Sequence, residues 1–186
     1  MFGFGLGEQK KAIPVVIDSV MPLFFESIRT IYTEAGVHHS KCNWIECAIF
    51  SFWSIRLGFS AADGTMADKY AADEVLASCI RRWINLLAKQ SGQRPTSGGA
   101  NAFYKTVRER YGEYLRTVET TAFRRSPSGN LDMPITEQTI HHFMRRTSLD
   151  SETLNALAPR IPQFNVALRE AQWAFAGIMK PVIQGD

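Results

Sequence analysis

The chain has 186 residues, of which 45% are hydrophobic and 21% are charged, and it carries a net charge of +3. These values exclude a disordered or fibrous chain, and the length fits one domain. No stretch approaches the roughly 20 apolar residues of a membrane-spanning helix, and three cysteines are too few for a disulfide framework. We therefore expect a cytoplasmic protein without a membrane span, in a reducing compartment.

The first residues form a glycine-rich segment that does not favour a helix. Phe2, Phe4 and Leu6 alternate with glycines, so residues 1–11 are predicted to form an extended N-terminal arm. The phenylalanine side chains of this arm suit contact with a neighbouring subunit. Residues 12–186 are predicted to form a single all-α domain.

The first predicted helix covers residues 12–35, where apolar side chains recur with the helical period. Pro22 lies inside this pattern and predicts a kink, because proline lacks the N–H group that continues a helix. Gly36 is expected to end the helix, since glycine adopts the left-handed conformation of a C-cap at little cost.

Two strongly apolar helices are predicted next, over about 43–57 and 66–90. The first of them is apolar around most of its circumference, which indicates packing on several sides. We expect this pair to lie at the centre of the domain. Glu46 is predicted to lie in the first turn, where its charge interacts favourably with the helix dipole. The less favoured alternative is a carboxylate in a pocket near Phe50 and Trp53, since a buried charge needs partners.

The second half of the chain is predicted to be helical as well. Residues 91–100 contain Gly, Ser, Pro and Thr without an apolar anchor and are predicted to form a flexible loop. Thr136 is expected to cap one helix, Ser148 or Asp150 the next, and Pro181 is expected to end the last. The later helices are predicted to cover about 102–123, 137–147, 150–157 and 163–180. The whole pattern predicts about seven helices packed as an irregular helical bundle.

The four histidines occur as two doublets, each preceded by a glutamate at the same distance. A Glu and a His four residues apart share one helix face, from which a carboxylate and an imidazole can bind one metal ion. If the two segments met, the metal ligands would be Glu34, His38, His39, Glu137, His141 and His142. The alternative is that the histidines lie at the surface or cap helix ends, and the sequence identifies no catalytic residue and no cofactor.

The cysteines allow two interpretations. Cys42 lies close to His38 and His39, which could activate it as a nucleophile. Cys47 and Cys79 are predicted on apolar helices, and buried cysteines usually behave as small hydrophobic residues. We favour the second interpretation for all three cysteines.

The excess positive charge is concentrated in residues 94–125, which contain seven basic and three acidic residues. A basic region can follow a phosphate backbone, and the candidate contacts are Arg94, Arg108, Arg124 and Arg125. The glutamates are interleaved with the basic residues, which is typical of a solvated and ion-paired helix face. Nucleic acid is therefore a less favoured partner.

Three functional hypotheses follow. Broad apolar helix faces are either core or interface, so the favoured hypothesis is a non-enzymatic helical interaction or assembly protein. Such a protein would form homo-oligomers or bind a protein partner. The first alternative is a metal-binding helical bundle, which could be an enzyme, using residues 34–39 and 137–142. The second alternative is nucleic-acid binding through residues 94–125.

Overall fold

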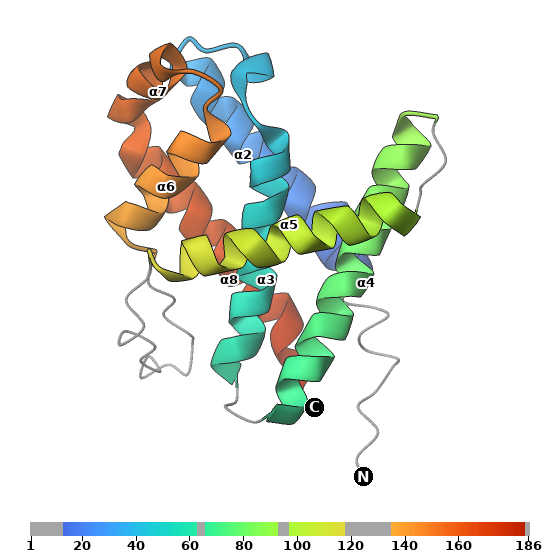
Figure 1. Ribbon diagram of the computed structural model, residues 1–186. Helices are drawn as coiled ribbons and strands as arrows, with labels where there is room; N and C mark the ends of the chain where they lie inside the picture. Colours follow the sequence, from blue (N-terminus) through green and yellow to red (C-terminus); the bar gives the residue numbers. More distant parts are fainter. Residues whose placement is uncertain (1–12, 63–65, 93–96, 118–134, 185–186) are drawn as a thin grey trace.

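The computed structural model describes residues 13–62, 66–92, 97–117 and 135–184 (Figure 1). The described part is all-α, as predicted, and its only β feature is an isolated bridge between Cys42 and Ser148. The longer helices are α2 (Met21–Glu34), α3 (Trp44–Ala62), α4 (Met66–Gln90), α5 (Ser97–Leu115), α6 (Glu137–Thr147), α7 (Ser151–Leu157) and α8 (Ile161–Gln184). The predicted arm at 1–11 lies outside the described residues.

Pro22 is predicted to kink the first helix, and the structure has a change of helix type just before this residue. A π-helical segment, η1 (Val16–Val20), precedes α2, and Pro22 occupies the first turn of α2. The wider π turn fits a proline, because its ring would crowd the carbonyl group four residues earlier in a regular α-helix. Gly36 ends α2 as expected, with φ of 72° and a hydrogen bond from the N–H of Val37 to the carbonyl of Tyr32, 2.9 Å long.

Helix α3 is the centre of the described core. It packs most extensively against α8 and also contacts α2, α4, α5 and α6. Figure 1 shows α5 lying across α3, with α4 near one end of α5 and α6 near the other. The central position predicted for α3 follows from its sequence, because nine consecutive side chains, which cover the full circumference of the helix, are buried: Cys47, Ala48, Ile49, Phe50, Ser51, Phe52, Trp53, Ser54 and Ile55.

The predicted helix boundaries hold at some positions and not at others. Helix α4 has the predicted bounds, whereas α3 continues to Ala62 and α5 begins at Ser97, inside the predicted loop. Helix α8 continues to Gln184, so Pro181 does not end it. A proline removes one hydrogen bond from a helix, and that loss alone does not stop a helix that is held by packing along α3.

The corner formed by α6 and α7 is fixed by polar caps. Thr136 caps α6 and accepts a hydrogen bond from the N–H of Thr139, which completes a capping box. Asp150, rather than Ser148, caps α7. Short bridging elements occur at η2 (His39–Lys41) and η4 (Ala158–Arg160). Within the described part of the chain, no helix combines the length and apolar character that crossing a bilayer would require.

Candidate functional site

The first predicted metal-binding segment lies at the turn between α2 and α3. Glu34 ends α2 and forms an ion pair with Arg160, 3.6 Å away. His38 and His39 are exposed, and their ring centroids are 4.2 Å apart. The side chain of His38 accepts a hydrogen bond from the N–H of Ser40, so this histidine caps η2. This contact is of the kind expected from the alternative hypothesis, in which the histidines cap helix ends instead of binding a metal ion.

The second predicted segment lies on α6, and its two histidines point to different neighbours. His141 is paired with Glu137 on the same helix, 3.6 Å away, and both are exposed. His142 instead faces Glu113 of α5, at 3.5 Å. No group of three or more His, Cys, Asp or Glu side chains suited to a metal ion occurs among the described residues. Metal binding stays a prediction, which the metal content of untagged protein tests.

The described part of the basic region has the mixed charge that the sequence indicates. Lys105 lies 3.9 Å from Glu109, and the exposed Arg108 lies over the ring of Tyr104, 6.0 Å from its centroid. The remaining candidate contacts lie outside the described residues: Arg94, Arg124 and Arg125. Nucleic-acid binding therefore also stays a prediction.

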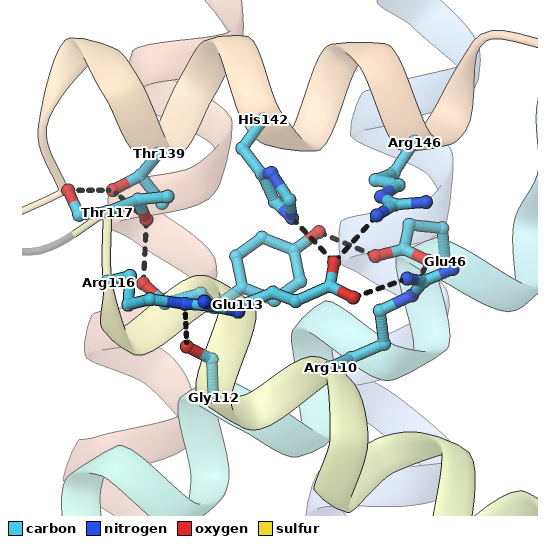
Figure 2. Close-up of polar contacts among 10 residues, drawn as sticks. Glu46, Arg110, Gly112, Glu113, Arg116, Thr117, Thr139, His142 and Arg146 are labelled. Carbon is cyan, nitrogen blue, oxygen red and sulfur yellow. Dashed lines mark hydrogen bonds and ion pairs between the residues drawn. The ribbon is translucent and has the colours of Figure 1, made fainter.

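A partly buried ion network joins α3, α5 and α6 (Figure 2). Glu46, in the first turn of α3 as predicted, is only 1% exposed. The hydroxyl group of Tyr114 donates a hydrogen bond to the Glu46 carboxylate, 2.9 Å long, and the Arg110 guanidinium lies 3.5 Å from the same carboxylate. A buried carboxylate requires such partners, because an isolated charge is strongly disfavoured away from water.

Glu113 is the centre of this network. Its carboxylate accepts a hydrogen bond from Arg110 on the same helix and another from Arg146 of α6, each 2.8 Å long. Figure 2 shows Arg146 and His142 reaching down from α6 toward this carboxylate, with Arg110 approaching from α5. The ring of His142 also packs edge-on against Tyr114, with centroids 4.9 Å apart. The network thus links the three helices through charge as well as packing.

The pKa values in this network shift in opposite directions. Burial raises the pKa of Glu46, and the hydrogen bond from Tyr114 and the charge of Arg110 only partly oppose it. Burial also acts to raise the pKa of Glu113, but Arg110 and Arg146 outweigh it, so the pKa lies below its usual value. For His142, burial and then the charge of Arg146 lower the pKa. Burial therefore favours the neutral form of Glu46, the two arginines favour the charged form of Glu113, and burial together with the charge of Arg146 favours the neutral form of His142.

Three threonines close the end of the junction between α5 and α6. The hydroxyl group of Thr136 donates a 2.6 Å hydrogen bond to the carbonyl of Thr117, and Thr117 donates to Thr139 at 3.1 Å. The cap of α6 thereby also holds the last described turn after α5. The hydroxyl groups of these three threonines satisfy one another, as buried polar groups in native proteins generally do.

The sequence predicts the turn that contains Glu46, whereas burial of this residue is the less favoured interpretation and its partners are not predicted. The spacing of the polar residues along α5 and α6 contains a partial signal for the network. Arg110 and Tyr114 are four residues apart, as are His142 and Arg146, so each pair lies on one helix face. The sequence does not contain the information that these two faces meet over α3.

A groove with a volume of about 520 Å³ runs between α2 and α8. Its lining combines small polar, apolar and acidic side chains: Ser27, Thr30, Ile31, Glu34, Pro162, Gln163, Val166, Ala167 and Glu170. The hydroxyl groups of Ser27 and Thr30 donate to carbonyl groups of their own helix, at 3.1 and 3.0 Å. Because both hydroxyl protons are already used in hydrogen bonds within α2, the α2 wall of the groove suits apolar contact.

The groove is bordered at one end by large exposed apolar side chains. Arg160 donates a hydrogen bond to the carbonyl of Glu34, so the start of α8 lies beside the end of α2 and the two helices are antiparallel. Leu23 is one turn before the groove on α2, and Trp173 is one turn after it on α8. These side chains are 69% and 55% exposed, and Val166 inside the groove is 56% exposed.

Acidic side chains flank this apolar surface. Glu34 is paired with Arg160, whereas Glu170 is exposed and forms no ion pair with any residue that the structure describes. A negative charge beside exposed apolar side chains favours a ligand that is both apolar and positively charged.

A second groove, of about 450 Å³, lies between η1, α2 and α4. Its apolar lining includes Phe25, Trp83 and Leu86, and the ion pair between Asp18 and Arg82 lies at its edge. Neither groove is lined by a member of the ion network. The network and the grooves are therefore separate features of the molecule.

Comparison of the chain with protein-family models, with curated proteins and with solved structures finds no match.

Proposed function

We propose that this protein is a non-enzymatic helical interaction protein that binds a basic amphipathic helix of a partner in the α2–α8 groove. The observation that carries this proposal is the exposure of Leu23, Val166 and Trp173 along one antiparallel helix pair. Large exposed apolar side chains gain free energy when a partner removes them from water.

The dimensions of the groove suit a helix. From Leu23 to Glu34, α2 rises by roughly 16 Å, which corresponds to three turns of a bound helix. Such a helix would place apolar side chains at positions i, i+3, i+4 and i+7 in the groove, as in other helix-in-groove complexes. Lysine or arginine residues on its flanks would then lie near Glu34 and Glu170.

The same groove of a second copy is an unsuitable occupant. Two hollow surfaces leave a gap when they face each other, and their acidic residues would be brought together. A convex and basic element is complementary on both counts. The groove therefore favours a partner of different chemistry over a symmetric contact between identical grooves.

Self-association is part of the same proposal, through other faces of the molecule. Exposed apolar side chains also occur away from the groove, at Val15, Ile45 and Leu149. Contact between unlike faces of two copies would cover some of them. Sedimentation equilibrium that gives a strict monomer at high concentration would remove self-association from the proposal and leave partner binding intact.

Binding is tested with a designed helical peptide that has leucines at i, i+3, i+4 and i+7 and lysines on both flanks. We expect fluorescence anisotropy to show saturable binding of this peptide. The variant Val166→Ser should bind the peptide about tenfold more weakly. Ile45→Ser is the matched control, because Ile45 and Val166 are both 56% exposed. Glu170→Lys should weaken binding of this peptide and strengthen binding of a peptide with glutamates in place of the lysines.

Two results would contradict the proposal. One is equal binding of the lysine and glutamate peptides, which would indicate nonspecific hydrophobic contact. The other is equal weakening by Val166→Ser and Ile45→Ser, which would place the bound peptide away from the groove.

A further inference from the structure

Two of the three cysteines are in contact beneath the turn that precedes α3. The Sγ atoms of Cys42 and Cys47 are 3.9 Å apart, and both side chains are buried. All three cysteines are free thiols, and Cys79 is buried separately on α4. Sequence analysis treated these residues as small hydrophobic side chains and missed the contact, because the turn before α3 sets the distance between the sulfur atoms.

We infer that Cys42 and Cys47 form a dithiol site that a small peroxide converts into an intramolecular disulfide. A disulfide bond is about 2.05 Å long, so the two sulfur atoms must approach each other by roughly 1.9 Å. Rotation of the two side chains provides much of such a movement. The inference is independent of the α2–α8 groove and of its partner.

The backbone of Cys42 is held outside the α-helices, where its N–H group donates a 3.1 Å hydrogen bond to the carbonyl of His39, so the approach of the sulfur atoms depends mainly on side-chain rotation. Cys42 lies outside the helices in an extended conformation, with φ of −90° and ψ of 130°, whereas Cys47 is held in the first turns of α3. Movement of Cys42 therefore breaks no hydrogen bond of the α3 ladder. Its backbone neighbour Asn43 is anchored to the carbonyl of Thr147, 2.7 Å away, which keeps the site closed on the far side.

The two thiols have different chemical character. The hydrogen bond from the Cys47 thiol lowers the pKa of Cys42, although burial opposes this effect. Burial raises the pKa of Cys47. Because the thiolate is the nucleophile, Cys42 is the sulfur that reacts first and Cys47 is the one that resolves the product.

The reaction with hydrogen peroxide balances without any other reagent. The Cys42 thiolate attacks one oxygen, the O–O bond breaks, and the released hydroxide takes up the proton that Cys42 gave up, forming water. Cys42 is now a sulfenic acid. The Cys47 sulfur then attacks the Cys42 sulfur, the S–O bond breaks, and the leaving hydroxide departs as water with the Cys47 proton. Two thiols are oxidised to one disulfide while peroxide is reduced to two waters.

A small oxidant suits this site because the access to it is narrow. Cys42 is 4% exposed and Cys47 is fully buried. Peroxide is of a size to reach such a sulfur, whereas a folded protein or a bulky disulfide is not. In a reducing compartment the bond would be transient, so the pair suits a reversible modification.

The test uses the full chain, reduced, desalted and treated with hydrogen peroxide, followed by denaturation and alkylation of the remaining thiols. We expect a mass loss of about 2 Da and alkylation of Cys79 alone. Trypsin releases residues 42–56 as one peptide, and cleavage after Glu46 then leaves two fragments joined only by the disulfide. Reduction should separate these fragments.

Variants distinguish the order of the steps. Cys47→Ser should leave Cys42 as a sulfenic acid that dimedone traps, whereas Cys42→Ser should leave Cys47 unmodified. Cys79→Ser should form the disulfide as the natural chain does. Three alkylatable thiols after treatment of the natural chain would overturn the inference, as would a disulfide that involves Cys79 or joins two chains.

Discussion

Two regions of this protein differ from the usual distribution of polar and apolar groups, and they differ in opposite directions. At the junction of α3, α5 and α6, the carboxylate of Glu46 is buried with Arg110 and Tyr114. Along α2 and α8, the apolar side chains of Leu23 and Trp173 are exposed. Both arrangements oppose the general preference of charges for water and of apolar groups for the interior.

The difference between them lies in where their partners are found. The charges of the junction are satisfied by one another, so that region is complete within the chain. The exposed side chains of the α2–α8 face have no such partner among the residues that the structure describes, and a contact from another molecule would remove them from water. We therefore assign stability to the first region and binding to the second, and substitutions can test each assignment.

The largest expected effect is that of Glu46→Ala. This substitution leaves the hydroxyl group of Tyr114 without its acceptor and removes one partner of Arg110. We expect a loss of about 3 kcal/mol in the free energy of unfolding, because removing one member of a buried pair leaves the other uncompensated. Urea unfolding followed by circular dichroism measures this loss.

Glu46→Gln is the control for that substitution. It keeps an acceptor for Tyr114 and removes the charge, whose burial is unfavourable, so the loss should be clearly smaller than for Glu46→Ala. If Glu46→Ala is as stable as the natural protein, the junction is not a source of stability and the comparison fails.

A smaller effect is expected for Glu113→Gln. The neutral side chain weakens the hydrogen bonds from Arg110 and Arg146, and we expect a loss of about 2 kcal/mol in the free energy of unfolding. Glu109→Gln is the matched control on the same helix, because the one ion pair of Glu109 among the described residues is an exposed pair with Lys105 and should contribute less than about 0.5 kcal/mol. Equal effects of the two substitutions would place Glu113 outside the stabilising network.

The pH dependence of stability separates His142 from the carboxylates. Burial and Arg146 lower the pKa of His142 from its usual value of 6.5, so the unfolded chain binds the proton more readily. Stability should therefore fall as the pH decreases below about 6.5 and level off below the folded pKa. The positive charges of three arginines disfavour protonation of His142, whereas the negative charge of Glu113 favours it; the arginines are Arg110, Arg145 and Arg146.

The variant His142→Gln isolates this contribution. It should flatten the profile of unfolding free energy between about pH 7 and pH 5, a range that brackets the unperturbed histidine pKa. Glu46, whose pKa is raised by burial, has the opposite sign, because its contribution falls as the pH rises above 4.5. An unchanged profile in His142→Gln would show that the histidine is not held neutral by the network.

Much of the fold follows from the helical period of the apolar residues and from the residues that cap or end helices. The apolar circumference of α3 predicts its central position, Gly36 predicts the end of α2, and Thr136 predicts the start of α6. These are local signals, because a cap or a helical period is set by residues within one or two turns. The bounds of α4 were predicted for the same reason.

The two regions compared above depend on contacts between distant segments, which no local signal specifies. Glu46 meets Tyr114 across 68 positions of the chain, and the sequence shows only a glutamate in a first helical turn. Leu23 and Trp173 each fit an apolar helix, and their exposure follows from the antiparallel packing of α2 and α8. Neither region could therefore be predicted from local patterns in the sequence.

The smallest expected effect on stability is that of Trp173→Ser, and it tests the other side of the comparison. Because Trp173 is 55% exposed, its loss should change the free energy of unfolding by less than about 0.5 kcal/mol, as is usual for surface substitutions. Binding of the lysine-flanked peptide should nevertheless weaken. Urea unfolding and fluorescence anisotropy on the same preparation measure both. A loss of stability as large as that of Glu46→Ala would mean that the tryptophan belongs to the core, and the α2–α8 face would then resemble the buried junction instead of differing from it.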